Sequence, residues 1–336
     1  MLISIVIPCY YSEKTIRTEV EAVMEQFAQH DGYECEFILV NDGSKDGTFS
    51  EIRALCDKYP NVKGVDLMRN FGQPNAQMAG LNFARGKYIL GMDDDMQTHP
   101  SQVFKLIHKI EEGYDVVYGV YPDSKNSFFK KLSSRINRFT SRIMLDMPKE
   151  IEATNFWMIS DRVRDEAIKY DSFNPYIDAI FYQVTHNYGQ VEVEHHKRES
   201  GESGYTFGKL VNLWLSYFNY SVVPLRISFG IGLAAAVLAV VLSILLIINK
   251  IMDPTLPIGW SSMMCVTVFL FGAVLMVLGV IGEYLGKAIL ILNKTPQFIV
   301  RESLNIPAEI SQTAGGCSME AETVSAEAAQ EDQCKD

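Results

Sequence analysis

The 336-residue sequence lacks several features that would place it in a common class of protein. Its six cysteines form no C-x-x-C pair and no zinc spacing with histidine, which favours reduced thiols in a cytosolic compartment. With 30 basic against 41 acidic side chains, it lacks the excess of positive charge that is typical of nucleic-acid-binding proteins. Its N-terminus, MLISIVIPCYYSE, lacks a basic region followed by a long apolar run, so we expect a buried first strand and not a signal peptide.

The negative charge is concentrated at the C-terminus. Seven acids and one base between Glu309 and Asp336 supply −6 of the total −11, so the other 308 residues carry −5. Residues 307–336 have almost no large apolar side chains and cannot offset the entropy of ordering. We expect a disordered acidic tail there.

Long apolar runs appear only late in the chain. Residues 227–248 and 258–282 contain no charge, and each run exceeds the roughly 20 residues that cross a bilayer. The linker NKIMDPTLP between them is short and holds two prolines, so the sequence predicts a transmembrane hairpin. The alternative is a pair of buried helices in a large soluble protein.

The flanking charges predict the orientation of this hairpin. Five basic residues flank it, against Lys250 alone in the turn: Lys209, Arg226, Lys287, Lys294 and Arg301. The positive-inside rule then keeps both long ends in the cytoplasm. We therefore expect a multi-pass protein of the plasma (inner) membrane with two helices, an aromatic interfacial segment over 206–226, and a cytoplasmic juxtamembrane segment over 283–306.

Residues 1–205 alternate short β-branched runs with amphipathic ones. The runs at 3–8, 35–42, 62–68, 87–93 and 114–120 are typical of strands, and those at 15–27, 49–59 and 100–113 have helical spacing. This alternation predicts an α/β domain with a mostly parallel sheet. In such sheets ligands bind beyond the carboxyl ends of the strands, so the polar residues that follow each strand are the candidates for function.

Two of these strand ends are turn-like and polar. Residues 8–13 follow the first strand, and residues 41–48 (NDGSKDGT) follow the second. An aspartate such as Asp42, just beyond a strand, can accept hydrogen bonds from a ribose or a base. Ordinary turn chemistry explains each cluster equally well when it is taken alone.

A third strand end carries three adjacent carboxylates, Asp93, Asp94 and Asp95. Their mutual repulsion is unfavourable unless a cation or several donors offset it. Mg²⁺ or Mn²⁺ would take oxygen ligands from Asp93, Asp95 and Gln97 and could bridge a nucleotide diphosphate. The alternative is a solvated acidic turn.

In this order, the three strand ends resemble those of family 2 glycosyltransferases with the GT-A (Rossmann-like) fold. The segments IVIPCYYSE, EFILVNDGSKDGT, RNFGQPNAQMAGLNFARGKYILGMDDDMQTHP and HHKRESGESGYTFGKL, with the hairpin after them, resemble enzymes that move a sugar onto a polyprenyl phosphate. They are most similar to undecaprenyl-phosphate aminoarabinose transferases, and more distantly to dolichyl-phosphate mannose synthases.

The resemblance implies roles for individual residues. It assigns nucleotide binding to Pro8, Tyr10, Glu13, Asp42, Arg69, Gln73 and Asp93. It assigns the metal and diphosphate to Asp93, Asp95 and Gln97, and catalysis to Asp93, Asp95 and Arg198. For the acceptor phosphate and lipid it implies Arg135, Arg138, Arg198, Ser203 and Tyr205.

The chain departs from these relatives at more than one motif. Many of them have Gly-Asp-Phe-Arg where this sequence reads Thr154-Asn155-Phe156-Trp157, so a carboxylate and a cation are missing. A lysine common in Gly-Glu-Ser-Lys-Tyr is here Gly204.

The expected reaction is inverting transfer from a nucleotide sugar, a UDP-sugar, to a polyprenyl phosphate for cell-envelope glycan or lipid modification. A phosphate monoester is largely a dianion near neutral pH and needs no strong base. Transfer to a sugar or lipid hydroxyl would need a base, and Asn155 cannot serve. A third alternative is an inactive scaffold that binds nucleotide or lipid.

Two further patterns bear on the membrane. The cations Lys131, Arg135, Arg138 and Arg142 share one helical stripe, which favours either an interfacial helix beside anionic lipid or an ordinary surface helix. The resemblance is also compatible with a homo-oligomer. Five glycines in the apolar runs would allow close contact between helices: Gly230, Gly232, Gly272, Gly279 and Gly282.

Overall fold

The structure is a computed structural model of the whole chain. It describes residues 1–95, 98–121, 151–173, 175–194, 259–293 and 295–306, with scattered positions between 225 and 252. The described residues group into two compact units. One contains the described residues up to 194 together with 295–306, and the other contains those between 225 and 293.

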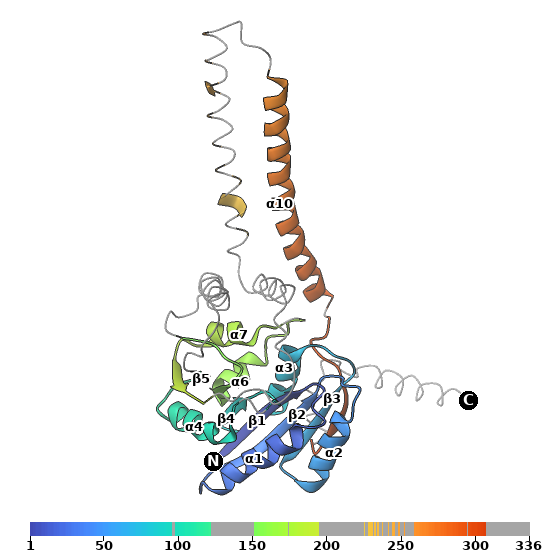
Figure 1. Cartoon of the computed structure of the whole chain (residues 1–336), viewed down its shortest axis with the longest axis vertical. Coiled ribbons are helices and arrows are strands. Elements are labelled where there is room, and N and C mark those ends of the chain that lie inside the picture. Colours follow the sequence, from blue (N-terminus) through green and yellow to red (C-terminus); the bar gives the residue numbers. More distant parts are fainter. Residues whose placement is uncertain are drawn as a thin grey trace, which may run out of the picture. The chain divides into compact units, whose positions relative to one another are not determined.

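The first unit is an α/β domain built on a single eight-stranded sheet (Figure 1). The strands run in the order β7-β5-β6-β4-β1-β2-β3-β8. Their bounds are β1 Leu2–Cys9, β2 Glu34–Asn41, β3 Val62–Leu67, β4 Tyr88–Gly91, β5 Val116–Val120, β6 Trp157–Ser160, β7 Tyr188–Glu192 and β8 Val300–Leu304. Strands β6 and β8 are antiparallel to their neighbours and the other pairs are parallel, which confirms the predicted mostly parallel sheet.

The helices of this unit cover both faces of the sheet. Their bounds are α1 Ile16–Ala28, α2 Thr48–Lys58, α3 Gln73–Phe83, α4 Val103–Glu111 after the short 3₁₀ helix Pro100–Gln102, α6 Asp161–Ala167 and α7 Ile177–Val184. Helices α1, α2 and α4 share one core with the strands, whereas α3 contacts β1 and β2 and α6 contacts β4 and β6. The predicted strands and helices up to residue 120 are therefore confirmed.

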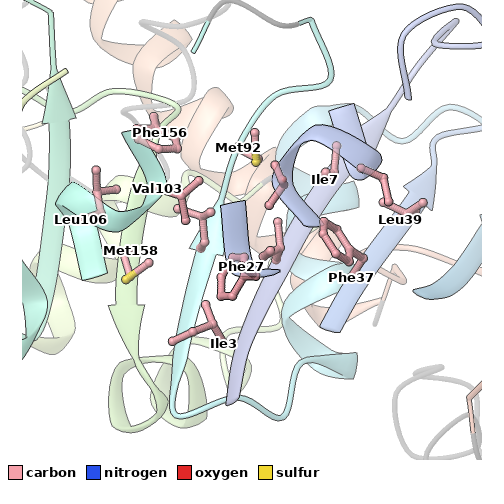
Figure 2. Close-up of a cluster of buried hydrophobic side chains, with 14 of the residues drawn as sticks. Ile3, Ile7, Phe27, Phe37, Leu39, Met92, Val103, Leu106, Phe156 and Met158 are labelled. Atoms are coloured by element: carbon pink, nitrogen blue, oxygen red, sulfur yellow. The ribbon is translucent and has the colours of Figure 1, made fainter. Parts of the chain in front are cut away.

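The core forms because the strands are apolar on both faces, as expected of a sheet with helices on each side. Side chains from α1, β1, β2, β4 and α4 meet in one cluster (Figure 2), including Ile3, Phe27, Phe37, Met92 and Leu106. All five are less than a tenth exposed. Burying an apolar side chain of this size contributes about 1.5–3 kcal/mol, so this cluster holds the sheet rigid beneath the loops at its carboxyl edge.

Strand β8 is an element that the sequence analysis did not predict. It lies within the stretch expected as a juxtamembrane segment, yet it pairs antiparallel with β3, from Gly64 opposite Leu304 to Leu67 opposite Val300. Asn305 ends it, in the left-handed region at φ 56°. The chain thus returns, after its apolar region, to complete the same sheet that begins at residue 2.

The second unit contains helix α10, Trp260–Leu292. Of the helices in the described ranges, one stretch, Phe269–Leu290, is long and apolar enough to cross a bilayer, with mean hydropathy 2.0. The helix continues past the end of the predicted run at Gly282, because a charged residue ends an apolar stretch without ending a helix. Of the predicted helix over 227–248 the structure describes ten scattered positions, and all ten are helical. The interfacial segment 206–226, apart from Leu225, and the acidic tail 307–336 lie outside the described residues.

Candidate active site

The candidate site lies at the carboxyl ends of the adjacent parallel strands β4, β1, β2 and β3. Four loops follow these strands, and they begin at Tyr10, Asp42, Met68 and Met92. Because parallel neighbours end at one edge of a sheet, residues far apart in sequence come together there. Three of these loops are the ones whose polar residues the sequence analysis singled out.

The loop after β1 presents two tyrosines to solvent. Tyr10 and Tyr11 are 51% and 53% exposed, and their rings meet edge to face with centroids 4.6 Å apart. Exposed aromatic rings suit stacking on a planar ligand. Pro8, by contrast, is buried inside β1, so it shapes the end of the strand. Glu13 reaches the second loop, where its Oε2 accepts a hydrogen bond from the Gly47 N–H at 3.1 Å.

Asp42 joins the loop after β2 to the loop after β3. Its Oδ1 accepts from Phe71 N at 2.7 Å and its Oδ2 from Gly72 N at 2.9 Å. Burial raises the pKa of Asp42, and the two backbone hydrogen bonds oppose that rise. A carboxylate oxygen has two lone pairs, so Asp42 keeps acceptor capacity after making these bonds.

The same two loops touch at Gly43. This glycine has φ +65°, and a Cβ there would lie 2.5 Å from the Asn70 nitrogen. Only glycine allows both the left-handed backbone and so close an approach. The neighbouring Arg69 is exposed, and its guanidinium lies 4.2 Å from the centre of the Phe71 ring.

Asp93 is held by two side-chain amides. Gln73 Nε2, from the first turn of α3, donates to its Oδ1 at 2.7 Å, and Asn155 Nδ2, from just before β6, donates to its Oδ2 at 2.9 Å. Burial raises the pKa of Asp93 to about 6; the Asn155 hydrogen bond opposes this rise, and the negative charges of Asp95 and Asp94 add to it. Neutral donors therefore offset part of the crowding of charge.

Asp94 faces a different partner from Asp93. Its Oδ2 accepts hydrogen bonds from Tyr10 N, at 3.3 Å, and from the Ser12 hydroxyl. It thus ties the loop after β4 to the loop after β1. Asp95 is half-buried beside them. The three adjacent carboxylates do not act as one cluster, because two of them are bound by different loops.

The expected metal ligands are only partly described. In the described ranges, no three His, Cys, Asp or Glu side chains are grouped so that they could hold a metal ion. Carboxylate oxygens are the ligands that Mg²⁺ and Mn²⁺ prefer, and the crowded negative charge of Asp93 and Asp95 fits such a cation. Asp94 is committed to Ser12 and Tyr10, and Gln97 lies outside the described residues.

The structure brings together most of the predicted nucleotide residues and adds others. Gln73 and Asp93 are in direct contact, and Glu13 and Asp42 each join two loops of the site. Ser12, Asp94 and Asn155 are contacts that the sequence analysis missed, although it had marked Asn155 as a departure from the relatives. The residues expected at the acceptor side, Arg135, Arg138, Arg198, Ser203 and Tyr205, lie outside the described residues, as does the basic stripe around them.

Comparison with known proteins gives consistent matches over the whole domain. Residues 4–167 match the family model described as Glycosyl transferase family 2. The uncharacterized glycosyltransferase YkcC of Bacillus subtilis is 31% identical over 306 residues, 90% of this chain and 94% of that protein. The undecaprenyl-phosphate 4-deoxy-4-formamido-L-arabinose transferase of Serratia proteamaculans is also 31% identical, over 312 residues, 89% of this chain and 93% of that protein.

A solved structure also aligns with the domain. It is glucosyl-3-phosphoglycerate synthase from Mycobacterium tuberculosis in complex with Mn²⁺, UDP-glucose and phosphoglyceric acid. The two proteins are 20% identical, the alignment covers 64% of this chain and 79% of the other, and the TM-score is 0.45. The chain has a GT-A-like α/β fold with a mostly parallel sheet.

Proposed function

Because the chain belongs to glycosyl transferase family 2, we propose that it moves a sugar from a nucleotide diphosphate sugar to a polyprenyl phosphate. The proposed donor is a UDP-sugar, and the proposed reaction inverts the anomeric carbon at the cytoplasmic face of the plasma (inner) membrane. The observation that carries this proposal is the junction of four strand-end loops around Asp93 and Asp42 at the carboxyl edge of the sheet. The relatives named for transfer to undecaprenyl phosphate support the choice of acceptor. The product would serve modification of cell-envelope glycan or lipid.

The donor side of this proposal rests on residues in the described part of the site. The exposed rings of Tyr10 and Tyr11 are suited to stack on a planar base. Asp42 retains acceptor capacity for a ribose hydroxyl, and Arg69 offers an exposed cation for phosphate oxygens. Glu13 holds the two nucleotide loops together through Gly47.

The proposed chemistry needs no strong base. A phosphate monoester has its second pKa at about 6, so the acceptor oxygen is already nucleophilic at neutral pH. That oxygen forms a bond to the anomeric carbon from the face opposite the nucleotide, and the bond to the diphosphate breaks, so that UDP leaves with the electron pair. Mg²⁺ or Mn²⁺, held by Asp93 and Asp95, would supply positive charge for the departing diphosphate. The proposed acceptor contacts are Arg135, Arg138, Arg198, Ser203 and Tyr205.

Membrane attachment by a hairpin is part of the proposal, and the connectivity supports it. Strand β8 follows α10 in the chain, yet it belongs to the same sheet as β1 to β7. One folded domain cannot lie on both sides of a bilayer. If α10 crosses, the chain must therefore cross once more between residues 194 and 260, and the apolar run 227–248 is the segment long enough to do so.

The test is transfer of radiolabelled sugar from a panel of UDP-sugars to undecaprenyl phosphate in detergent, with Mg²⁺, Mn²⁺ or EDTA. Wild type, Asp95→Ala and Asp57→Ala would be compared, because Asp57 is an exposed carboxylate on α2, in the opposite half of that helix from the site loops. We expect a lipid-soluble product that disappears with EDTA and with Asp95→Ala and persists with Asp57→Ala. Product formed only on hydroxyl acceptors, or UDP binding without any turnover, would refute the lipid-phosphate assignment.

A further inference from the structure

The segment that follows the apolar helix makes an unusual set of contacts with the site loops. We call residues 295–305 the return segment, since they bring the chain back to the sheet after α10. All of its contacts described below lie within the first unit. Several of them are side-chain bonds to loop backbone and to a buried carboxylate, which ordinary strand pairing does not require.

Arg301 is the centre of these contacts. Its Nη1 donates to Asp66 Oδ2 at 3.0 Å and its Nη2 to the Met68 carbonyl at 2.7 Å. The Asp66 side chain is only 3% exposed, and a buried carboxylate needs such partners. Arginine is suited to this role because its planar guanidinium donates in two directions at once.

The bonds of Asp66 continue into the nucleotide loop after β2. Asp66 Oδ1 accepts from Asn41 Nδ2 at 2.7 Å, and Asn41 Oδ1 in turn accepts from Ser44 N at 3.3 Å. Asn41 immediately precedes Asp42 and is itself buried. Arg301 is therefore two hydrogen-bonded side chains away from the loop that holds Asp42.

The loop 68–72 is anchored at both of its ends. At the start, Met68 N donates to the Ile299 carbonyl at 2.9 Å and Arg301 binds the Met68 carbonyl. At the end, Asp42 binds the N–H groups of Phe71 and Gly72. Arg69, the exposed cation proposed for the diphosphate, lies between the two anchors.

We propose that Arg301 is a positioning residue for the nucleotide-sugar donor: by binding Asp66 and Met68 it holds loop 68–72, and with it Arg69 and Asp42, in the donor-binding arrangement. This inference rests on the proposed function. It gives the return segment a role in the site beyond completing the sheet, and it reassigns Arg301 from a flanking charge of the membrane hairpin to the donor side of the site.

A second residue of the return segment contacts another loop of the first unit. Gln297 is buried, and its Nε2 donates to the carbonyls of Ser172 and Tyr170 at 2.9 and 3.3 Å. The next residue of that loop, Phe173, accepts from Asn75 Nδ2 at 3.4 Å, and Asn75 lies in the first turn of α3 beside Gln73. The return segment thus contacts both the loop that precedes α3 and a loop that bonds the first turn of α3.

The strand offers a matched control for Arg301. Arg53 on α2 pairs with Glu302, the next residue of β8, and its Nη2 lies 2.9 Å from both carboxylate oxygens. Arg53→Ala removes an arginine pair that holds the same strand, but it does not touch loop 68–72. An effect that comes only from weakened docking of β8 should appear in Arg53→Ala as well as in Arg301→Ala.

The experiment uses the full chain in detergent and measures UDP affinity by calorimetry and the transfer kinetics for donor and acceptor. For Arg301→Ala we expect UDP affinity to fall and the donor KM to rise by about 10-fold, with kcat and the polyprenyl-phosphate KM unchanged. Arg301→Lys, which can reach one of the two acceptors, should recover part of the loss. Arg53→Ala should match wild type.

Three results would overturn the inference. They are equal defects in Arg53→Ala and Arg301→Ala, a fall in kcat with donor KM unchanged, and unchanged UDP affinity in a folded Arg301→Ala protein. If Arg301→Ala does not fold, the same measurements on Arg301→Lys and Asp66→Asn decide, because both keep the side-chain volume. Wild-type protein that does not bind UDP would instead contradict the donor named under the proposed function, so the two failures are distinguishable.

Discussion

Asn155 donates a 2.9 Å hydrogen bond to Asp93 and so connects the start of β6 to the loop after β4. The contact places a neutral donor against the most strongly perturbed carboxylate of the site, whose pKa burial raises to about 6. Sequence comparison alone presents Asn155 as the loss of a carboxylate. In the structure it supplies a hydrogen bond to Asp93, because an amide can donate to a carboxylate and a second ionised carboxylate could not.

Asn155→Asp should therefore destabilise the protein, although it restores the residue common in relatives. The change removes a donor from Asp93 and places a second negative charge beside it, which should lower the free energy of unfolding by about 1–3 kcal/mol. The measurement is the Tm in detergent, together with the transfer rate. Asn82→Asp on α3 is the control, since Asn82 bonds the Met78 carbonyl and no carboxylate. An Asn155→Asp protein with the Tm and rate of wild type would contradict this account.

Asp94→Ala should weaken binding of the nucleotide-sugar donor and leave the chemical step unchanged. Asp94 connects the loop after β4 to the loop after β1 through Tyr10 N and the Ser12 hydroxyl. Its removal therefore frees the loop after β1, which carries the exposed tyrosines. We expect the nucleotide-sugar KM to rise by about 10-fold with little change in kcat. Steady-state kinetics beside Asp57→Ala test this. If Asp94→Ala instead abolishes kcat as Asp95→Ala is expected to, then Asp94 acts on the reacting groups and not on the loop.

The pH dependence of stability should carry a contribution from Asp178 in the first turn of α7. Burial raises its pKa to about 6, and the Tyr118 hydroxyl, 3.0 Å away, donates to its Oδ1. The ordinary pKa of aspartate is about 3.9, so the folded state binds this proton more tightly than the unfolded state. The stability contribution is therefore fully present below about pH 4, and it is lost as pH rises toward and through about 6.

Asp178→Asn should remove this dependence, since asparagine can still accept from Tyr118 and never ionises. Its Tm should match wild type near pH 4 and exceed it above pH 7, by an amount equivalent to about 2 kcal/mol. Thermal scans between these pH values provide the measurement. Asp171→Asn, at an exposed aspartate of the preceding loop, is the control and should not change the profile. A Tm difference that is the same at every pH would mean that burial of charge is not its origin.

Local patterns in the sequence were enough to predict the nucleotide half of the fold. Strands β1 to β5 and helices α1, α2 and α4 have clear periodicity, and the residues Asp42 and Asp93 follow apolar strands in the way that parallel sheets require. Gln73 and Asp93, to which the family resemblance gives roles in nucleotide binding, are in contact, and the roles themselves stay predictions. The strand and helix predictions succeeded because each depends on a few neighbouring residues.

The parts that could not be predicted depend on contacts between distant residues. The sequence VRESL is short and polar, and it becomes β8 only because β3, more than 200 residues earlier, offers an open edge. The sequence alone therefore presents Arg301 as a flanking charge of the membrane helices, although its partner in the structure is the buried Asp66. Asn155 was missed for the same reason, since nothing in the order of residues indicates that it meets Asp93, 62 positions away.

Gly43→Ala should separate backbone strain from steric conflict at the nucleotide loop. Gly43 and Gly32 both have positive φ, +65° and +88°, so alanine costs about 1–2 kcal/mol at either position. At Gly43 the new Cβ would also lie 2.5 Å from Asn70 N and 2.9 Å from Arg69 Cα, whereas at Gly32 nothing lies within 4 Å. The total at Gly43 should reach about 2–5 kcal/mol, and the Arg69 loop must move.

The expected outcome is therefore a modest Tm loss for Gly32→Ala with unchanged UDP affinity, and a larger Tm loss for Gly43→Ala with weaker UDP binding. Calorimetry and thermal scans on the full chain measure both quantities. Equal effects of the two substitutions would mean that the loops after β2 and β3 are not in contact in solution. Weaker UDP binding in Gly43→Ala alone would mean that the donor is bound where these two loops meet, because Gly32 shares the strained backbone and lacks only the contact.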